Sequence, residues 1–401
     1  MRTEAANKEA FNKPTLNKQI SNKQTSNENT PQLVTFNIRA MGCQVRINLN
    51  ISSLSYPLSK VELDQQTCLL ASKIEQKLAY WEHIFSRFNE TSELMQLNHH
   101  TNQWWQVSAE LFEVLQLAIE FVPKTQGLVT PTLLQSMWAA GYKHSFETLP
   151  KLSIPTKPCT DSSAMPCTAL NIKENAEDRA LGNDRHQNIE SIQLHRLTDG
   201  TYQVYLPTGM ALDLNGYVKG WCAMQLADYI SRGYDYRLPC LVDMGGDIAI
   251  GVPDNQDAEI EIDPVTWGIA IAKPYAINSE PPFFDEACDV SGDEDVAVVS
   301  ISSGAIATSG QDYRRWRHKG RWQHHLIHPH HSCPVTSDVL TATVIAADTM
   351  TAEVYAKYCV LLGSKAAMAW LNNQNIAALL IDTEYNVMVS PAMRPSLIQL
   401  L

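Results

Sequence analysis

The chain has 401 residues, of which 44% are hydrophobic and 18% charged, a composition typical of a globular protein with a sizeable core. Its formal net charge is −12, from 31 basic and 43 acidic residues, which excludes a broad basic surface for nucleic acid. No run approaches the roughly 20 consecutive apolar residues of a membrane-spanning helix. We therefore expect neither nucleic-acid binding nor stable membrane insertion.

Residues 1–32 are rich in Asn, Lys and Thr, and we expect a disordered tail there. The tail has no apolar run typical of a secretory signal and no cysteine for lipid attachment. The nine cysteines are odd in number and never occur in C-x-x-C spacing, which favours free thiols in a reducing compartment. These features predict a cytoplasmic protein.

The first elements after the tail are a predicted strand pair and a series of helices. Residues 33–50 alternate between apolar and polar and predict two strands that turn near Met41-Gly42. The predicted helices cover about 59–85, a short stretch capped by Thr91 or Ser92, and 109–122. Before the last helix, we expect Trp104 and Trp105 in the core or in the wall of a pocket.

Two stretches without periodicity, residues 151–190 and the acidic residues 278–295, predict surface insertions. Between them, an Asp-Gly pair separates two alternating runs and predicts a hairpin over 191–207. The other predicted strands are 240–243, 267–272, 297–302, 339–346, 376–382 and 386–390, and the other predicted helices are 217–231, 351–362 and 365–372. The pattern predicts a mixed α/β (α+β) fold with a single large domain over 33–401.

The sequence DLNGYVKG, residues 213–220, places an acid, two glycines and a lysine at one bend. We expect residues 212–214 to end a strand and Tyr217 to begin a helix. The free N–H groups of a helix N-terminus, with Lys219 in the first turn, favour a phosphate or another anion. Asp213 can bond a ribose or a base edge, or orient the lysine. The simpler alternative is an ordinary strand–turn–helix whose lysine is solvated.

Three further bends combine a predicted strand with glycine or polar groups. They are CLVDMGGDIAIG (240–251), GAIATSGQDYRRW (304–316) and HHLIHPHHSCPV (324–335). Adjacent glycines after a strand, as in the first of these, suggest backbone packed against a ligand or a crossing strand.

Taken in order, these segments resemble the FAD:protein FMN transferase family, the flavin transferases related to the thiamine-biosynthesis lipoprotein ApbE. The matching segments are MGC (41–43), FSRFNETSELMQLN (85–98), GLVTPTLLQSMWAAG (127–141), DLNGYVKG, LVDMGGD, AIATSGQDYRRW, HHLIHP and TVIAADTMTAEVYAKYCVLLG (343–363). The resemblance extends from about 35 to 390. It implies an ApbE-like flavin transferase domain that carries two loop insertions.

The family cleaves FAD with Mg²⁺ and transfers FMN to a threonine of an acceptor protein, so FAD, Mg²⁺ and such an acceptor are implied for this chain. By position, the residues that contact FAD would be Met41, Phe88, Thr130, Asp213, Lys219 and His325. The residues that ligate the metal would be Gly216, through its carbonyl, and Glu353. The residues with a catalytic role would be His325, Glu353 and Lys357.

The match departs from the family at the metal site. The family's metal-binding aspartate and threonine lie four residues apart on the last long helix, where this chain has Glu353 and Lys357. A protonated ammonium cannot ligate a hard cation, and we expect it to pair with Glu353 in part of the volume that Mg²⁺ fills. Two further departures are Leu128, in place of an acid, and His330-His331-Ser332, in place of Arg-Thr-Gly. A flavin-binding or flavin-trafficking protein that lost the metal-dependent transfer therefore stays open as an alternative function.

Six histidines between 318 and 331 raise the separate hypothesis of a zinc site. In a continuous strand, His324, His328 and His330 would share one face. However, no acid or cysteine follows at a recognised ligand spacing, although Cys333 is near. We expect most of these side chains to be exposed, with His325 turned toward the flavin.

Overall fold

The computed structural model describes residues 32–52, 54, 59–146, 189–233, 236–254, 265–276 and 294–401. The expected disordered tail and the two expected insertions lie almost entirely outside these ranges, so the proposed domain limits stay a prediction. Within the described ranges, no helix has both the length and the apolar character needed to cross a membrane.

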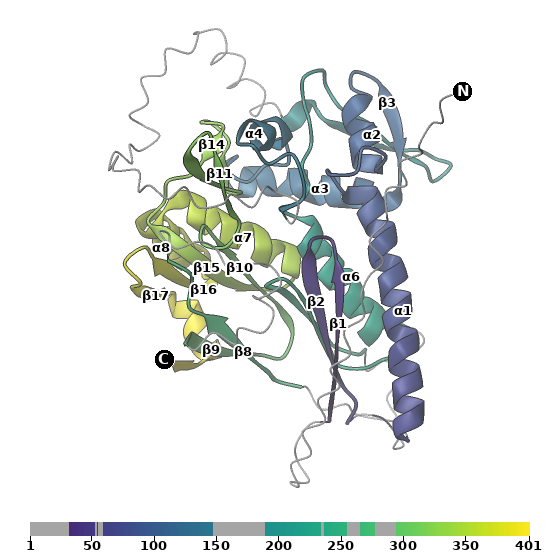
Figure 1. Ribbon diagram of the computed structural model, residues 1–401, viewed down its shortest axis with the longest axis vertical. Helices are drawn as coiled ribbons and strands as arrows, with labels where there is room; N and C mark the ends of the chain where they lie inside the picture. Colours follow the sequence, from purple (N-terminus) through teal and green to yellow (C-terminus); the bar gives the residue numbers. More distant parts are fainter. Residues whose placement is uncertain are drawn as a thin grey trace, which may run out of the picture.

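An eight-stranded sheet forms the centre of the fold, and all of its neighbouring strands are antiparallel (Figure 1). Its spatial order is β1 (Leu33–Ala40), β2 (Cys43–Asn50), β6 (Cys240–Met244), β7 (Asp247–Gly251), β10 (Gly304–Gly310), β15 (Val339–Ala346), β16 (Ala377–Asp382) and β17 (Val387–Val389). Pairing of β2 with β6, from Val45 opposite Met244 to Leu49 opposite Cys240, joins segments that are far apart in sequence.

The remaining elements surround this sheet. The helices are α1 (Lys60–Phe85), α2 (Glu93–His99), α3 (Ala109–Lys124), α4 (Leu134–Ala139), α6 (Val218–Ser231), α7 (Thr349–Leu362) and α8 (Ser364–Gln374). Two small sheets have the orders β3 (Trp104–Val107), β5 (Tyr202–Tyr205), β4 (Gln193–Arg196), and β18 (Leu397–Leu400), β9 (Asp295–Ile301), β8 (Trp267–Ala272). Two hairpins join β11 (Arg315–His318) to β12 (Arg321–His324) and β13 (Ile327–His328) to β14 (Cys333–Pro334).

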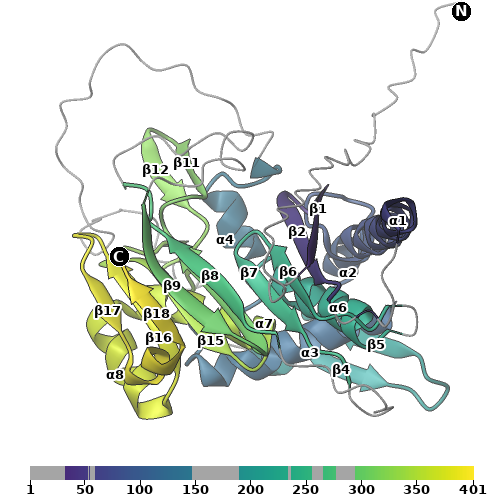
Figure 2. The same ribbon diagram turned by 90° about the horizontal axis from the view of Figure 1, so that it is seen from below.

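Alternating side chains of the central sheet build a separate core on each face. On β16, Leu379 and Ile381 pack against residues of β8 and β9, whereas Ala378 and Leu380 pack against α7 and α8. Further along the sheet, β1, β2 and β6 share a core with α1 and α6. The period-two alternation of a strand thus produces three layers, with the small β18–β9–β8 sheet on one face and helices on the other (Figure 2).

Side-chain caps explain where several helices begin. Ser59 and Glu62 form a reciprocal capping box at the start of α1. Ser92, and not Thr91, caps α2 by accepting from Met95 N at 3.1 Å. The predicted strand pair over 33–50, the hairpin over 191–207 and the later helices and strands are also confirmed, with ends that differ by a few residues.

Two local expectations were wrong. Residues 212–214 are not part of a strand, because the Leu212 N–H donates to the side chain of Asn98 at 2.7 Å instead of to a neighbouring strand. Trp104 is 42% exposed, since it lies on the open face of a small sheet. By contrast, the close packing expected at Gly245-Gly246 is observed. The pair forms the tight turn of the β6–β7 hairpin, with φ values of 69° and 95°, and a Cβ on Gly245 would lie 3.1 Å from Cys43 Cβ of the neighbouring strand β2.

Close approach of α6 to α7 depends on Gly220. A Cβ at this position would lie 2.7 Å from Glu353 Oε2 and 3.0 Å from the Thr349 carbonyl oxygen. We expect Gly220→Ala to lower the free energy of unfolding by about 1–3 kcal/mol, because overpacking outweighs the higher helix propensity of alanine. Urea denaturation would measure this loss. Gly268→Ala in β8 is the control, since its Cβ would meet no atom within 4 Å.

Candidate functional site

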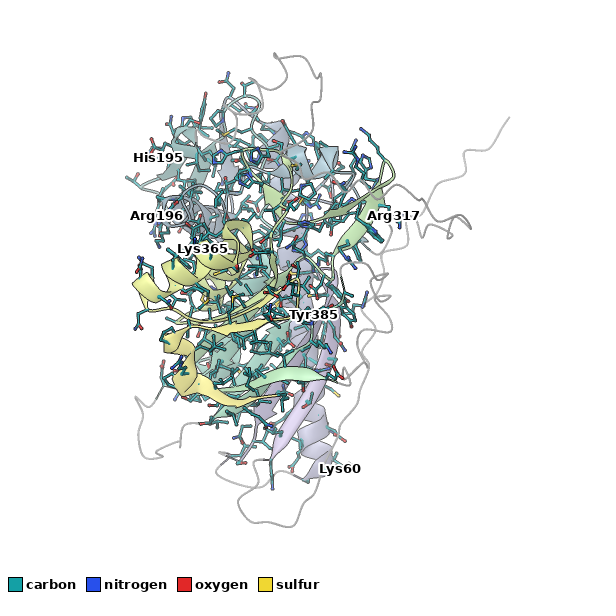
Figure 3. The ribbon with its side chains drawn as sticks, turned by 90° about the vertical axis from the view of Figure 1, so that its left-hand side faces the viewer. Lys60, His195, Arg196, Arg317, Lys365 and Tyr385 are labelled. Carbon is teal, nitrogen blue, oxygen red and sulfur yellow. The ribbon has the colours of Figure 1, made fainter. Side chains whose placement is uncertain are left out.

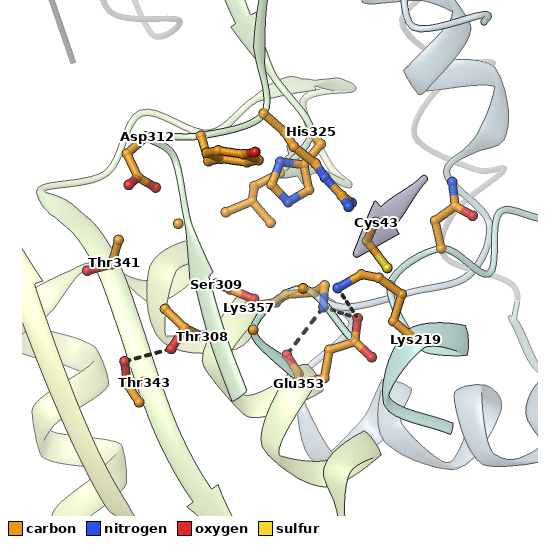
Figure 4. Close-up of a pocket in the computed structure, with 18 of the residues that line it drawn as sticks. Cys43, Lys219, Thr308, Ser309, Asp312, His325, Thr341, Thr343, Glu353 and Lys357 are labelled. Atoms are coloured by element: carbon orange, nitrogen blue, oxygen red, sulfur yellow. Dashed lines mark hydrogen bonds and ion pairs between the residues drawn. The ribbon is translucent and has the colours of Figure 1, made fainter. Parts of the chain in front are cut away.

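A cavity of about 800 Å³ opens beside the first turn of α6 and the middle of α7. All four bends identified in the sequence contribute residues to its wall. These residues come from within the ranges Asp213–Lys219, Asp243–Gly246, Thr308–Arg314 and His325–Ile327. These segments are far apart in sequence. The central sheet pairs β7 with β10, and the turn before α6 and the connection between β12 and β13 contribute to the same cavity wall (Figure 4). A roomy pocket with a few convergent polar groups is typical of a small-molecule site.

Most of the predicted site residues line this cavity. They are Thr130, Asp213, Gly216, Lys219, His325, Glu353 and Lys357. Met41 and Phe88 do not line it. Met41 contacts Cys222, with 3.8 Å between the two sulfur atoms, and the Phe88 ring centroid lies 5.7 Å from that of Tyr142 in the cavity wall. Their roles as flavin contacts stay predictions.

Glu353 is the centre of a buried charge cluster (Figure 4). Lys357 Nζ donates to Glu353 Oε1 at 2.8 Å, which confirms the expected pair, and Lys219 Nζ lies 3.9 Å from the same oxygen. Lys219 also donates to Asp247 Oδ2. Gly220 N donates to Glu353 Oε2 at 2.9 Å. The expectation of a free anion site at the start of α6 is therefore wrong for this N–H group, since a carboxylate from α7 already occupies it.

Burial does not affect the four charged groups of this cluster equally. It lowers the pKa of the Lys357 ammonium and raises the pKa of the Asp247 carboxyl, whereas ion pairing prevails at Glu353 and Lys219. Burial opposes ionisation of Glu353, but Lys357 and Lys219 outweigh it and lower the pKa of this carboxyl. Burial also opposes protonation of Lys219, yet Asp247 and Glu353 raise the pKa of its ammonium. Glu353 and Lys219 are therefore ionised at neutral pH. Lys219 is therefore not the solvated lysine of the simpler alternative, and because it also lines the cavity, its role toward a phosphate stays a prediction.

The donor set around Glu353 does not fit a divalent cation. Both of its oxygens accept hydrogen bonds, and an ammonium contacts one of them. The Lys357 side chain also packs against Gly216: a Cβ on that glycine would lie 3.4 Å from Lys357 Cε. The lysine thus lies between the two residues predicted to hold a metal. Across the described ranges, no group of three or more His, Cys, Asp or Glu side chains is arranged to bind a metal ion.

Arg87 is a site residue that the sequence analysis did not identify. Its side chain is fully buried, with Nε 3.2 Å from Asp213 Oδ2 and Nη1 donating to the Tyr142 carbonyl at 2.8 Å. The guanidinium lies 4.2 Å from the Phe88 ring centroid and 4.3 Å from that of Tyr142. Arg87 therefore holds Asp213 at the cavity wall. A lone arginine in a polar loop gives no sequence signal that separates it from a solvated one.

The histidines belong to three different segments, so the single strand that would align His324, His328 and His330 does not exist. His324 is buried at the end of β12, its Nε2 bonds the Val335 carbonyl at 2.9 Å, and burial lowers its pKa to about 4. The rings of His328 and His331 pack together, with 4.4 Å between their centroids. His325 alone of this group faces the cavity in Figure 4.

Burial and the charges of Arg314, His324, Lys357 and Lys219 lower the pKa of His325 well below its usual value. Its imidazole is therefore neutral at pH 7. A neutral imidazole can donate from one nitrogen and accept at the other, which suits a polar ligand.

Curated proteins similar to this chain cover most of its length. The chain is 26% identical over 336 residues to the FAD:protein FMN transferase of Vibrio cholerae, covering 82% of this chain and 84% of that protein. It is 22% identical over 335 residues to the protein of the same name from Escherichia coli K12, covering 82% of each.

Two solved structures have the same fold. The ApbE protein from Thermotoga maritima aligns with a TM-score of 0.68 at 20% identity, over 92% of this chain and 100% of that one. The flavin transferase ApbE from Vibrio cholerae aligns with a TM-score of 0.61 at 22% identity, also over 92% and 100%. The sequence model of the ApbE family matches residues 41–380. The chain therefore belongs to the ApbE family.

Proposed function

We propose that this chain is an FAD:protein FMN transferase that binds FAD in the cavity of about 800 Å³. The convergence of Asp213, Lys219 and His325 from three separate bends on one cavity is the observation that carries the proposal. In this reaction a threonine hydroxyl oxygen of the acceptor protein bonds to the phosphorus of the FMN half. The anhydride bond of FAD breaks, AMP leaves and the hydroxyl proton is lost.

The chain's own side chains supply the groups that this transfer needs. Lys219 and Lys357 place positive charge beside the diphosphate, where negative charge shifts toward the leaving phosphate. His325, a neutral imidazole in the wall, can accept a hydrogen bond from the acceptor hydroxyl and so orient it toward the phosphorus. Arg87 keeps the Asp213 carboxylate in place through the contact at 3.2 Å.

The Mg²⁺ implied by the resemblance does not fit the residues present, because Lys357 lies between Gly216 and Glu353. Instead, the Lys357 ammonium supplies a cation at this position, although it lacks the Lewis acidity of a metal. The presence of Lys357 where the family has a metal-binding threonine also favours the alternative function, a flavin-binding protein without transferase activity. The two functions differ in whether AMP and covalently flavinylated acceptor appear.

The test is incubation of the purified full chain with FAD and a threonine-bearing acceptor protein, followed by in-gel flavin fluorescence and mass spectrometry of the acceptor. We expect a covalent FMN adduct and one AMP for each transfer. An acceptor with alanine in place of the threonine is the control. Tight FAD binding without AMP or adduct would instead support the flavin-binding alternative.

His325→Ala should weaken FAD binding by about 2- to 10-fold, the effect of losing one neutral hydrogen bond. Because the wild-type ring is already neutral, FAD affinity should not change between pH 6 and 8 through this residue, near the usual histidine pKa of about 6.5. Fluorescence titration would measure both effects. His331→Ala, outside the cavity wall, is the matched control. Stoichiometric zinc that is lost on mutating His328 and His330 would contradict the assignment.

A further inference from the structure

Three arginines follow β10 in the sequence RRWR, and only one of them lines the cavity. Arg315 is buried and donates to the Ala276 carbonyl at 3.1 Å. Arg317 is exposed at the outer edge of β11, with its guanidinium 4.6 Å from the Trp322 ring centroid (Figure 3). Arg314 is half-buried in the cavity wall. Arg315 and Arg317 therefore each have a structural partner, the Ala276 carbonyl and the Trp322 ring, and Arg314 contacts neither of them.

The other cationic side chains of the wall each have a partner. The pairs are Lys219 with Asp247, Lys357 with Glu353, Lys273 with Glu294 and Arg46 with Asn37. Among the acids of the wall, Asp213 is paired with Arg87, Asp243 accepts from Gly246 N at 2.8 Å, and Asp312 accepts from Tyr275 N at 3.2 Å. Within the part of the chain that the structure describes, the Arg314 side chain has neither a hydrogen bond nor an ion pair.

Arg314 lies close enough to His325 and to Lys219 of the buried charge cluster to influence the pKa of each. Its charge is the second cause, after burial, that lowers the pKa of His325, and it opposes protonation of Lys219. A half-buried guanidinium near the Lys219 ammonium is unfavourable unless an anion compensates it. Because the lysines of the cluster already share Asp247 and Glu353, the uncompensated positive charge near the cluster belongs to Arg314.

We propose that Arg314 binds the diphosphate of the dinucleotide and so selects ligands that carry this group. The inference rests on the proposed function for the choice of FAD as the ligand. A guanidinium presents several N–H donors in a fixed plane, which suits bidentate contact with phosphate oxygens. The two negative charges of a diphosphate would compensate Arg314 and leave the Lys219 and Lys357 pairs intact.

The experiment compares wild type, Arg314→Gln and Arg317→Gln as full chains, with FAD, ADP and riboflavin as probes. Calorimetric or fluorescence titration should show that Arg314→Gln weakens FAD and ADP binding by about 10- to 100-fold, as expected for one charge-assisted contact. Riboflavin, which has no phosphate, should bind both proteins equally. Arg317→Gln should match wild type with all three probes. Thermal unfolding should be unchanged in Arg314→Gln, because the side chain has no partner among the described residues.

Equal affinity of wild type and Arg314→Gln for FAD and ADP would overturn the proposal. An equal loss for riboflavin would also overturn it, because the arginine would then act on the cavity shape and not on phosphate. A wild-type protein that binds FAD and ADP through Arg314 but transfers no FMN would contradict the proposed transferase and leave the role of Arg314 standing.

Discussion

The double variant Glu353→Asp/Lys357→Thr should convert FAD binding and turnover from largely metal-independent to dependent on Mg²⁺. In the wild type, the Lys357 ammonium lies 2.8 Å from Glu353 Oε1 and passes over Gly216, so it occupies the place where a cation would meet both residues. Threonine removes this charge and offers a hydroxyl oxygen. Aspartate keeps a carboxylate but shortens it by one methylene. Together they restore oxygen ligands of the kind that Mg²⁺ prefers.

FAD affinity and transfer rate would be measured with Mg²⁺ and with chelator. For the wild type we expect less than about a threefold difference, and for the double variant at least about tenfold, equivalent to ~1.4 kcal/mol. Lys365→Thr is the control, because Lys365 is exposed on the neighbouring helix α8 (Figure 3). Transfer by the wild type that strictly requires Mg²⁺, and that the double change does not improve, would show that Lys357 moves aside and that Glu353 still binds metal.

Lys219→Ala should reduce FAD affinity by about 10- to 100-fold, because it removes a charge-assisted contact worth about 1.5–3 kcal/mol. It should also destabilise the fold. Asp247 and Glu353 would lose a shared cation, and removal of one partner from a buried ion pair costs up to about 3–5 kcal/mol. We expect a smaller loss here, because the Lys219 side chain is 15% exposed and water can solvate the carboxylates.

A second variant separates the two effects. Lys219→Met/Asp247→Asn replaces the ion pair by neutral groups of similar size, so it should recover most of the stability lost in Lys219→Ala. It should not recover FAD affinity. Urea denaturation and FAD titration on the same preparations would test both parts. Recovery of affinity together with stability would mean that Lys219 supports the fold of the cavity wall and has no direct role toward FAD.

Patterns within short segments determined much of this fold. The alternation of residues 33–50, the Asp-Gly turn of the 191–207 hairpin and the serine before α2 each depend on interactions only a few residues apart. Such local preferences hold whatever the rest of the chain does, which is why the predicted elements were confirmed. The ordered series of bends, each recognisable by residue type, also sufficed to identify the ApbE family.

The tertiary structure alone decided which partner each charged group takes. No sequence pattern predicted that Lys219, besides lining the cavity, pairs with Asp247 of β7 and lies near Glu353 of α7. Residues 212–214 looked like a strand, but a side chain of α2 takes the backbone hydrogen bond that a neighbouring strand would need. Arg87 carried no signal at all in the sequence. In each case the contact joins segments far apart in the chain, and their distance is set by the packing of helices on the sheet, which no local pattern encodes.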